Sequence, residues 1–88
     1  SGFVRYVFGR LGIGLPRTTY QQEYQGPFLE LSQLQAGDLS FWGGRGSTHH
    51  VGIYMGGNQY IHAPETGDVV KISSVSSYNP PSFGVRVR

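Results

Sequence analysis

The sequence contains no cysteine. This absence excludes disulfide bonds, thiolate zinc sites and a thiol nucleophile from the 88 residues themselves. Long apolar runs are absent as well, and no run approaches the ~20 residues that a membrane-spanning helix needs. We find no signal-peptide pattern, and because the chain starts with Ser1 rather than Met, we expect it to be a piece or a processed form of a longer protein.

Charged residues are few and are not gathered into runs. The chain has 7 basic and 5 acidic residues, with a net charge of +2, and its arginines are scattered along the sequence. A nucleic-acid-binding domain usually concentrates its basic residues on one face or along one helix. The charge pattern therefore argues against nucleic acid as a partner and is compatible with an anionic polymer such as a cell wall.

Glycine, proline and aromatic residues are plentiful for a chain of this length, which is enough for one small domain over residues 1–88. There are 14 Gly, 5 Pro, 6 Tyr, 5 Phe and 1 Trp. Glycine and proline mark turns, and aromatic residues suit pleated strands and can line a peptide groove. The composition predicts short strands joined by turns.

The first segment has the pattern of an amphipathic helix. Apolar residues recur at helical spacing over residues 1–11, while Arg5 and Arg10 lie off the apolar stripe. Gly12, Gly14 and Pro16 then end the helix. A second short helix is predicted over residues 18–25.

From residue 38 onward the apolar period changes from helical to alternating. Strands are predicted over residues 38–42, 50–55, 59–63, 69–72 and 85–88, and the Gly-rich segment 43–48 is predicted to be a mobile loop. Helices followed by strands are typical of an α+β domain. We therefore expect an N-terminal helix packed on a five-stranded antiparallel sheet.

Three histidines are the side chains best suited to acid–base chemistry near neutral pH. His49 and His50 are adjacent on a predicted strand, so they should point to opposite faces and only one of them can join a given site. His62 follows on the next strand.

The hairpin between these strands decides whether His50 and His62 meet. A three-residue loop over 56–58 pairs Met55 with Gln59 and places His62 diagonally across from His50 on one face. A two-residue loop would shift the register and separate them. The Gly-rich loop favours the first register, in which His50 acts as a base and His62 orients its ring.

Other interpretations of these histidines remain open. They can be ordinary surface or core residues, or His50 and His62 can bind zinc together with Asp38 or Asp68, although no recognised ligand spacing is present. Segment 44–48 lacks the lysine of a phosphate-binding loop, and no Gly-x-Ser-x-Gly motif indicates a serine hydrolase.

Five short motifs in order give the chain a family resemblance that extends from Ser1 to about Ile72. Together they are similar to the NlpC family of papain-like cysteine peptidases. The motifs are Ser1-Gly2-Phe3-Val4, Leu15-Pro16-Arg17-Thr18-Thr19, Leu34-Gln35-Ala36-Gly37-Asp38-Leu39, His50-Val51-Gly52-Ile53-Tyr54 and Ile61-His62-Ala63-Pro64.

The resemblance implies a thiol nucleophile just outside this sequence. Family members carry Asp-Cys-Ser-Gly-Phe at the start of the first helix, which places the catalytic cysteine immediately before Ser1. A helix N-terminus and a neighbouring histidine both stabilise a thiolate. By position, His50 resembles the general base and His62 the ring-orienting residue, while Ser1 and Thr19 resemble residues near the bound substrate.

The resemblance also implies a function. The family consists of bacterial cell-wall hydrolases that cleave peptidoglycan stem peptides, commonly between D-glutamate and a diamino acid, and that need no metal or organic cofactor. We therefore expect a secreted thiol protease, extracellular or associated with the cell wall, that acts as a monomer. The alternative is a non-catalytic module that binds cell wall or peptide.

Overall fold

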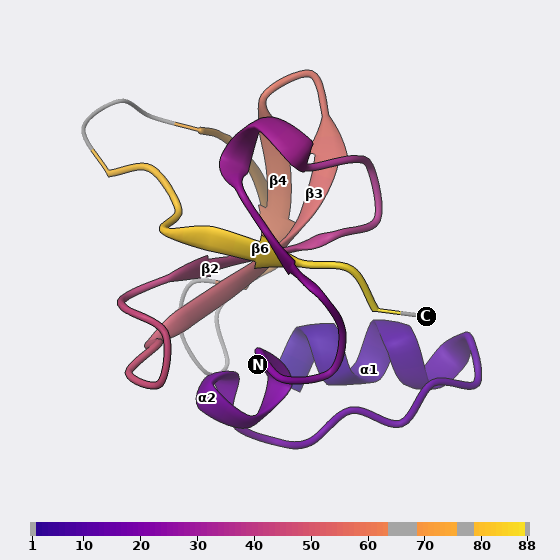
Figure 1. Cartoon of the computed structure of the whole chain (residues 1–88). Coiled ribbons are helices and arrows are strands. Elements are labelled where there is room, and N and C mark those ends of the chain that lie inside the picture. Colours follow the sequence, from indigo (N-terminus) through magenta and orange to yellow (C-terminus); the bar gives the residue numbers. More distant parts are fainter. Residues whose placement is uncertain (1, 64–68, 76–78, 88) are drawn as a thin grey trace.

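An antiparallel sheet forms the centre of the structure, a computed structural model that describes residues 2–63, 69–75 and 79–87 (Figure 1). Within these residues the sheet has six strands in the order β1-β6-β2-β3-β4-β5. Two short helices and one 3-10 turn complete the described part of the fold. The elements are α1 (Gly2–Arg10), α2 (Thr19–Gln22), β1 (Phe28–Leu29), η1 (Leu31–Gln33), β2 (Leu39–Trp42), β3 (His50–Gly56), β4 (Gln59–His62), β5 (Lys71–Ser74) and β6 (Phe83–Val85).

Helix α1 confirms the amphipathic pattern read from the sequence. Val4 and Phe8 are buried on its inner side, while Arg10 is exposed in its last turn. The helix ends where Gly12 takes a positive φ of 83° and Ile13 donates its N–H to the carbonyl of Phe8. Only glycine adopts that backbone conformation at little cost, so Gly12 determines where the helix ends.

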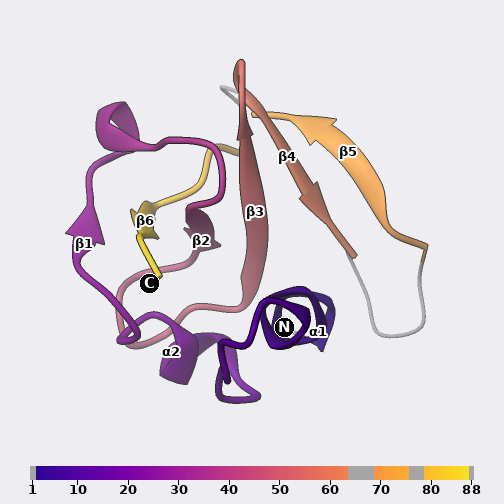
Figure 2. The ribbon, with the colours of Figure 1, turned by 90° about the vertical axis from the view of Figure 1, so that its right-hand side faces the viewer.

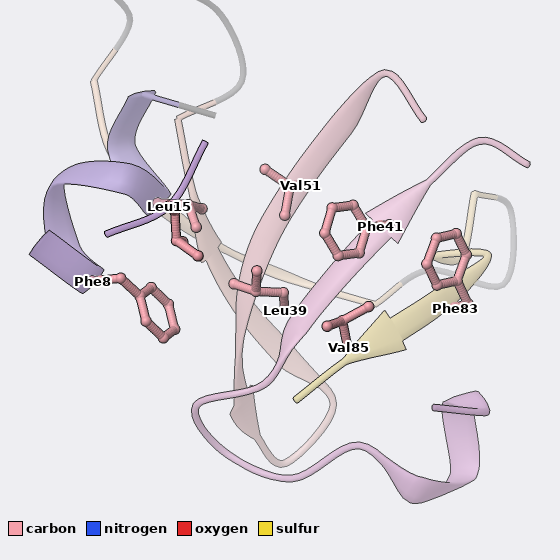
Figure 3. Close-up of a cluster of buried hydrophobic side chains, with 8 residues drawn as sticks. Phe8, Leu15, Leu39, Phe41, Val51, Phe83 and Val85 are labelled. Carbon is pink, nitrogen blue, oxygen red and sulfur yellow. The ribbon is translucent and has the colours of Figure 1, made fainter. Parts of the chain in front are cut away.

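The hydrophobic core lies between α1 and the sheet (Figure 3). Each large apolar side chain buried in it contributes roughly 1.5–3 kcal/mol. Figure 2 shows α1 below the starting end of β3, with β1, β6 and β2 on one side of β3 and with β4 and β5 on the other. The buried residues of the core are Val4, Phe8, Leu15, Leu39, Phe41, Val51, Phe83 and Val85.

The expectation of an α+β domain with an antiparallel sheet is confirmed, but the expected count of five strands was wrong. The strand missing from the prediction is β1, which consists of only Phe28 and Leu29 and pairs with β6. Two residues are too few to show an alternating pattern. The last strand also lies earlier than predicted, because Phe83 pairs with Phe41 of β2 and stacks on its ring.

The hairpin between β3 and β4 has the predicted register, but its turn differs from the predicted one. Its turn has two residues, Gly57 and Asn58, which both have positive φ values of 60° and 65°. These values match the type I′ turn that suits twisted hairpins. A bulge at Met55 absorbs the extra residue, so Ile53 pairs with Ile61 as a three-residue loop would have required. The predicted loop length was wrong, and its consequence for the histidines still holds.

Candidate active site

His50 and His62 meet across adjacent strands. His50 is the first residue of β3 and His62 the last of β4. The Nε2 atom of His50 lies 2.8 Å from the Nδ1 atom of His62, which is hydrogen-bond distance, and the ring planes stand at 71° to each other. Each histidine thus has one nitrogen committed to the other.

Two aromatic rings hold this pair in place. The ring of Trp42, the partner of His50 across β2 and β3, lies 5.1 Å from the His50 ring. The Tyr60 ring lies 4.6 Å from His62 and 4.7 Å from Trp42. Trp42 is itself fixed, because its Nε1 donates a hydrogen bond of 2.9 Å to the carbonyl of Asn79. Packing of this kind restricts the rotation of both imidazoles.

Gly52 makes room for the arrangement. A Cβ atom at this position would lie 2.9 Å from the Cδ2 atom of Tyr60 and 3.4 Å from the Cβ atom of His62. Any side chain larger than hydrogen would therefore push Tyr60, and with it His62, away from β3. Close packing against Tyr60 therefore requires glycine at this position of the His-Val-Gly motif.

The histidines open onto a cleft with a volume of about 340 Å³. His49 is exposed, precedes β3, and donates its N–H to the carbonyl of Trp42. The prediction that only one of His49 and His50 can join a site was wrong for this cleft, because His49 is not yet in the strand. Of these two histidines, His50 is the one that contacts a nitrogen of His62 at hydrogen-bond distance. The cleft is lined by Trp42, His49, His50, Tyr60, His62 and Asn79.

Burial, and to a lesser extent the positive charge that His62 can carry, lower the pKa of His50 from 6.5 to about 4. The imidazole is therefore neutral at pH 7 and able to accept a proton. Among the described residues no hydrogen bond engages its Nδ1 atom. This nitrogen is the one that can serve as a base.

Ser73 extends the hydrogen bonding of the histidine pair, and the sequence analysis did not identify it. The Nε2 atom of His62 lies 2.9 Å from the Oγ atom of Ser73 on β5. Ser73 pairs with Tyr60, so its side chain shares a face with His62 two residues along β4. Ser73 stands in an ordinary serine-containing strand, and no local motif marked it.

The Gly-rich segment that was predicted to be a mobile loop is held by a buried carboxylate. Glu23 is fully buried; its Oε1 accepts the N–H of Gly46 at 2.6 Å and its Oε2 the hydroxyl of Thr48 at 2.7 Å. Arg45 lies over the Tyr24 ring at 5.0 Å. The segment leading into His50 is thereby fixed to the chain that follows α2.

Of the two residues predicted to lie near substrate, Thr19 is among the described residues. Thr19 is buried, and its hydroxyl donates a hydrogen bond of 2.7 Å to the carbonyl of Thr48. It belongs to the support of the loop and does not line the cleft described above. Ser1 lies outside the described residues. The substrate contacts of Ser1 and Thr19 stay predictions.

The carboxylate considered for a zinc site is engaged elsewhere. Asp38 accepts hydrogen bonds from Nε and Nη2 of Arg86, both at 3.0 Å, and from the N–H of Gln35. No group of three metal-ligating side chains occurs within residues 2–63, 69–75 and 79–87. Asp68, the other carboxylate considered, lies outside the described residues. The structure therefore does not bring Asp38 to the histidines.

The structure thus combines a helix packed on an antiparallel sheet with a hydrogen-bonded histidine pair on neighbouring strands. The model of the NlpC/P60 family matches residues 1–87. The chain belongs to the NlpC/P60 family.

Three relatives show how far the similarity extends. The chain is 40% identical over 87 residues to the murein DD-endopeptidase MepS/murein LD-carboxypeptidase of Escherichia coli K12, covering 98% of this chain and 44% of that protein. It is 37% identical over 79 residues to the gamma-D-glutamyl-L-lysine dipeptidyl-peptidase of Bacillus subtilis, covering 86% and 27%. The solved NlpC/p60 domain of the peptidoglycan hydrolase SagA superposes with a TM-score of 0.90 at 46% identity, covering 99% of this chain and 74% of that one. The chain thus spans less than half of the two curated relatives.

Proposed function

We propose that this domain forms most of a cysteine endopeptidase that cleaves peptidoglycan stem peptides, with its nucleophile immediately before Ser1. The observation that carries the proposal is the 2.8 Å contact between His50 and His62, which commits one nitrogen of His50 and leaves Nδ1 to act as a base. Membership of a family that includes murein peptidases supports the choice of substrate.

The first half of the reaction transfers the acyl group to sulfur. Nδ1 of His50 takes the thiol proton, and the sulfur attacks the carbonyl carbon of the scissile amide. The C–N bond then breaks, the leaving nitrogen takes the proton back from Nδ1, and a thioester remains. His62 holds the imidazole at the angle that both transfers need and itself gives up no proton.

The second half regenerates the enzyme. A water molecule gives one proton to Nδ1 of His50 while its oxygen adds to the thioester carbon. The C–S bond breaks, the carboxylic acid product leaves, and the sulfur departs as a thiolate that pairs with the His50 imidazolium. A thiolate so close to His50 favours the charged imidazole, which offsets the lowering of its pKa by burial.

The proposal also names the bond that is cleaved. We assign the amide between D-glutamate and the diamino acid, which agrees with the name of the Bacillus subtilis relative. The name of the Escherichia coli relative describes other stem-peptide bonds, so the assay must identify products. The described residues that line the cleft are aromatic and imidazole rings and the amide of Asn79, with no carboxylate among them, which suits a peptide chain that carries carboxyl groups.

We further propose that the domain acts at the cell wall or outside the cell, where its substrate lies. No helix among the described residues is long and apolar enough to cross a membrane.

Digestion of purified muropeptides tests the proposal. A longer form of the protein that includes the residues before Ser1 should release fragments ending at D-glutamate, identified by mass spectrometry, and the 88-residue chain should release none. The matched control is the longer form with its cysteine replaced by alanine. Binding without turnover by the longer form would instead support a non-catalytic wall-binding module and contradict the proposal.

A further inference from the structure

We infer that Ser73 is a positioning residue that supports the Nε2–H tautomer of His62, and through it the protonation pattern of His50. This inference rests on the proposed function only for its consequence in catalysis. The hydrogen-bond chain itself is a property of the described residues. It runs from β3 through β4 to β5, with contacts of 2.8 Å between His50 and His62 and 2.9 Å between His62 and Ser73.

Sheet register explains why Ser73 reaches His62. β4 and β5 pair antiparallel, with Tyr60 opposite Ser73 and His62 opposite Lys71. A diagonal neighbour on the same face lies within reach of a long or aromatic side chain. The His62 imidazole bridges this distance, since it is buried and held by the ring of Tyr60 at 4.6 Å.

The placement of protons shows what the serine does. For His50 to act as a base, its Nδ1 must carry a lone pair, so its single proton sits on Nε2 and is donated to Nδ1 of His62. A neutral His62 must then carry its own proton on Nε2, pointing at the Oγ atom of Ser73. Ser73 accepts that hydrogen bond in the competent state.

The opposite tautomer is incompetent. If the proton of His62 sits on Nδ1, it is donated to Nε2 of His50, and the proton of His50 moves to Nδ1. That nitrogen then cannot take a proton from a thiol. The same arrangement of His62 is needed after proton transfer, because the His50 imidazolium donates from Nε2. The Ser73 hydroxyl can bond either tautomer of His62, because it both donates and accepts. Without it the Nε2–H form would leave a buried N–H unpaired, which is costlier than an unpaired lone pair, so Ser73 supports the two states that the reaction uses.

Long-range ¹⁵N–¹H spectra of the histidine side chains test the inference without any catalysis. In the 88-residue chain at pH 7 we expect His62 to be protonated mainly on Nε2. Ser73→Ala should shift its population toward the Nδ1–H form, and Ser73→Thr, which keeps the hydroxyl, should restore the original spectrum. Ser73→Asp offers only acceptor atoms and should hold the Nε2–H form. Ser74→Ala, on the neighbouring exposed position of β5, is the matched control and should change nothing.

Kinetics of the longer form then measure the consequence. Ser73→Ala should lower kcat about 3- to 10-fold with little change in KM, the size expected for one hydrogen bond made within the enzyme rather than to substrate. Ser73→Thr should recover most of that loss. An Nδ1–H form of His62 in the unmodified chain, or a tautomer unaffected by Ser73→Ala, would overturn the inference. Absence of any turnover by the longer form would overturn the proposed function alone and leave the tautomer result standing.

Discussion

Replacing Glu23 tests how the fold positions His50 in the site. Its carboxylate is fully buried and accepts two hydrogen bonds, from Gly46 at 2.6 Å and from Thr48 at 2.7 Å. Hydrogen bonds to a charged group contribute about 1.5–3 kcal/mol, against about 0.5–1.5 kcal/mol for neutral pairs. Glu23→Gln has one acceptor oxygen in place of two, so it can accept the N–H of Gly46 while its NH2 group donates to the Thr48 hydroxyl, and it loses the charge. Unfolding should therefore become easier by roughly 1–2 kcal/mol.

Glu23→Ala should cost more, because it leaves the N–H of Gly46 and the buried hydroxyl of Thr48 without their acceptor. We expect a loss of about 3–5 kcal/mol, a large share of the roughly 5–15 kcal/mol that stabilises a domain. For a chain of this length each kcal/mol lowers Tm by roughly 4–8 °C. Calorimetry of the 88-residue chain measures both variants, and Glu30→Gln, at an exposed carboxylate, is the control.

A double-mutant cycle assigns the effect to the contact. Thr48→Val removes the hydroxyl that donates to Glu23, so Glu23→Gln should be less damaging in that background by about 0.5 kcal/mol or more. In the longer form, Glu23→Gln should also lower kcat, since the loop it fixes leads directly into His50. A Tm for Glu23→Gln within 1 °C of the unmodified chain, or strictly additive effects with Thr48→Val, would refute this reasoning.

Three further predictions concern the histidines. In the longer form, His50→Ala should lower kcat by several orders of magnitude, whereas His49→Ala, which removes only a cleft-lining ring, should be mild; comparable losses would contradict the assignment of the base. His62→Asn and His62→Gln can still accept a hydrogen bond from His50 and should retain more activity than His62→Ala, with no effect of a chelator; inhibition by the chelator, with amides no better than alanine, would indicate a metal site instead. The pKa of His50 is lowered from 6.5 to about 4, so the folded state binds this proton less tightly than the unfolded chain does. The free energy of unfolding of the 88-residue chain should therefore fall as the pH drops from about 6.5 to about 4. His50→Asn should weaken this pH dependence, measured by urea unfolding at a series of pH values. An unchanged pH dependence in the variant would show that other groups cause it.

The features with local causes were predictable from the sequence. Helix α1 has a clear apolar stripe and ends at Gly12, where only glycine takes the required backbone angle at little cost. The pairing of His50 with His62 followed from strand alternation, even though the turn was wrong. Met55 bulges out and restores the register that a two-residue turn would otherwise have shifted.

The features that depend on distant pairing were not predictable. β1 is two residues long and exists because it pairs with β6, more than fifty residues away along the chain. Ser73 reaches His62 only through the register of β4 against β5, which no tight turn sets. No local pattern marks Glu23 as buried, because its burial depends on the distant loop at Gly46, which donates a hydrogen bond to it.

The central claim is that a cysteine before Ser1 is acylated with His50 as its base. Intact-mass spectrometry of the longer form, quenched by acid during turnover of a stem peptide, tests it most directly. We predict a mass increase equal to the acyl part of the substrate, located by digestion on the cysteine that precedes Ser1, and its absence in His50→Ala over the same interval. Unimpaired hydrolysis after that cysteine is replaced by alanine would contradict the claim.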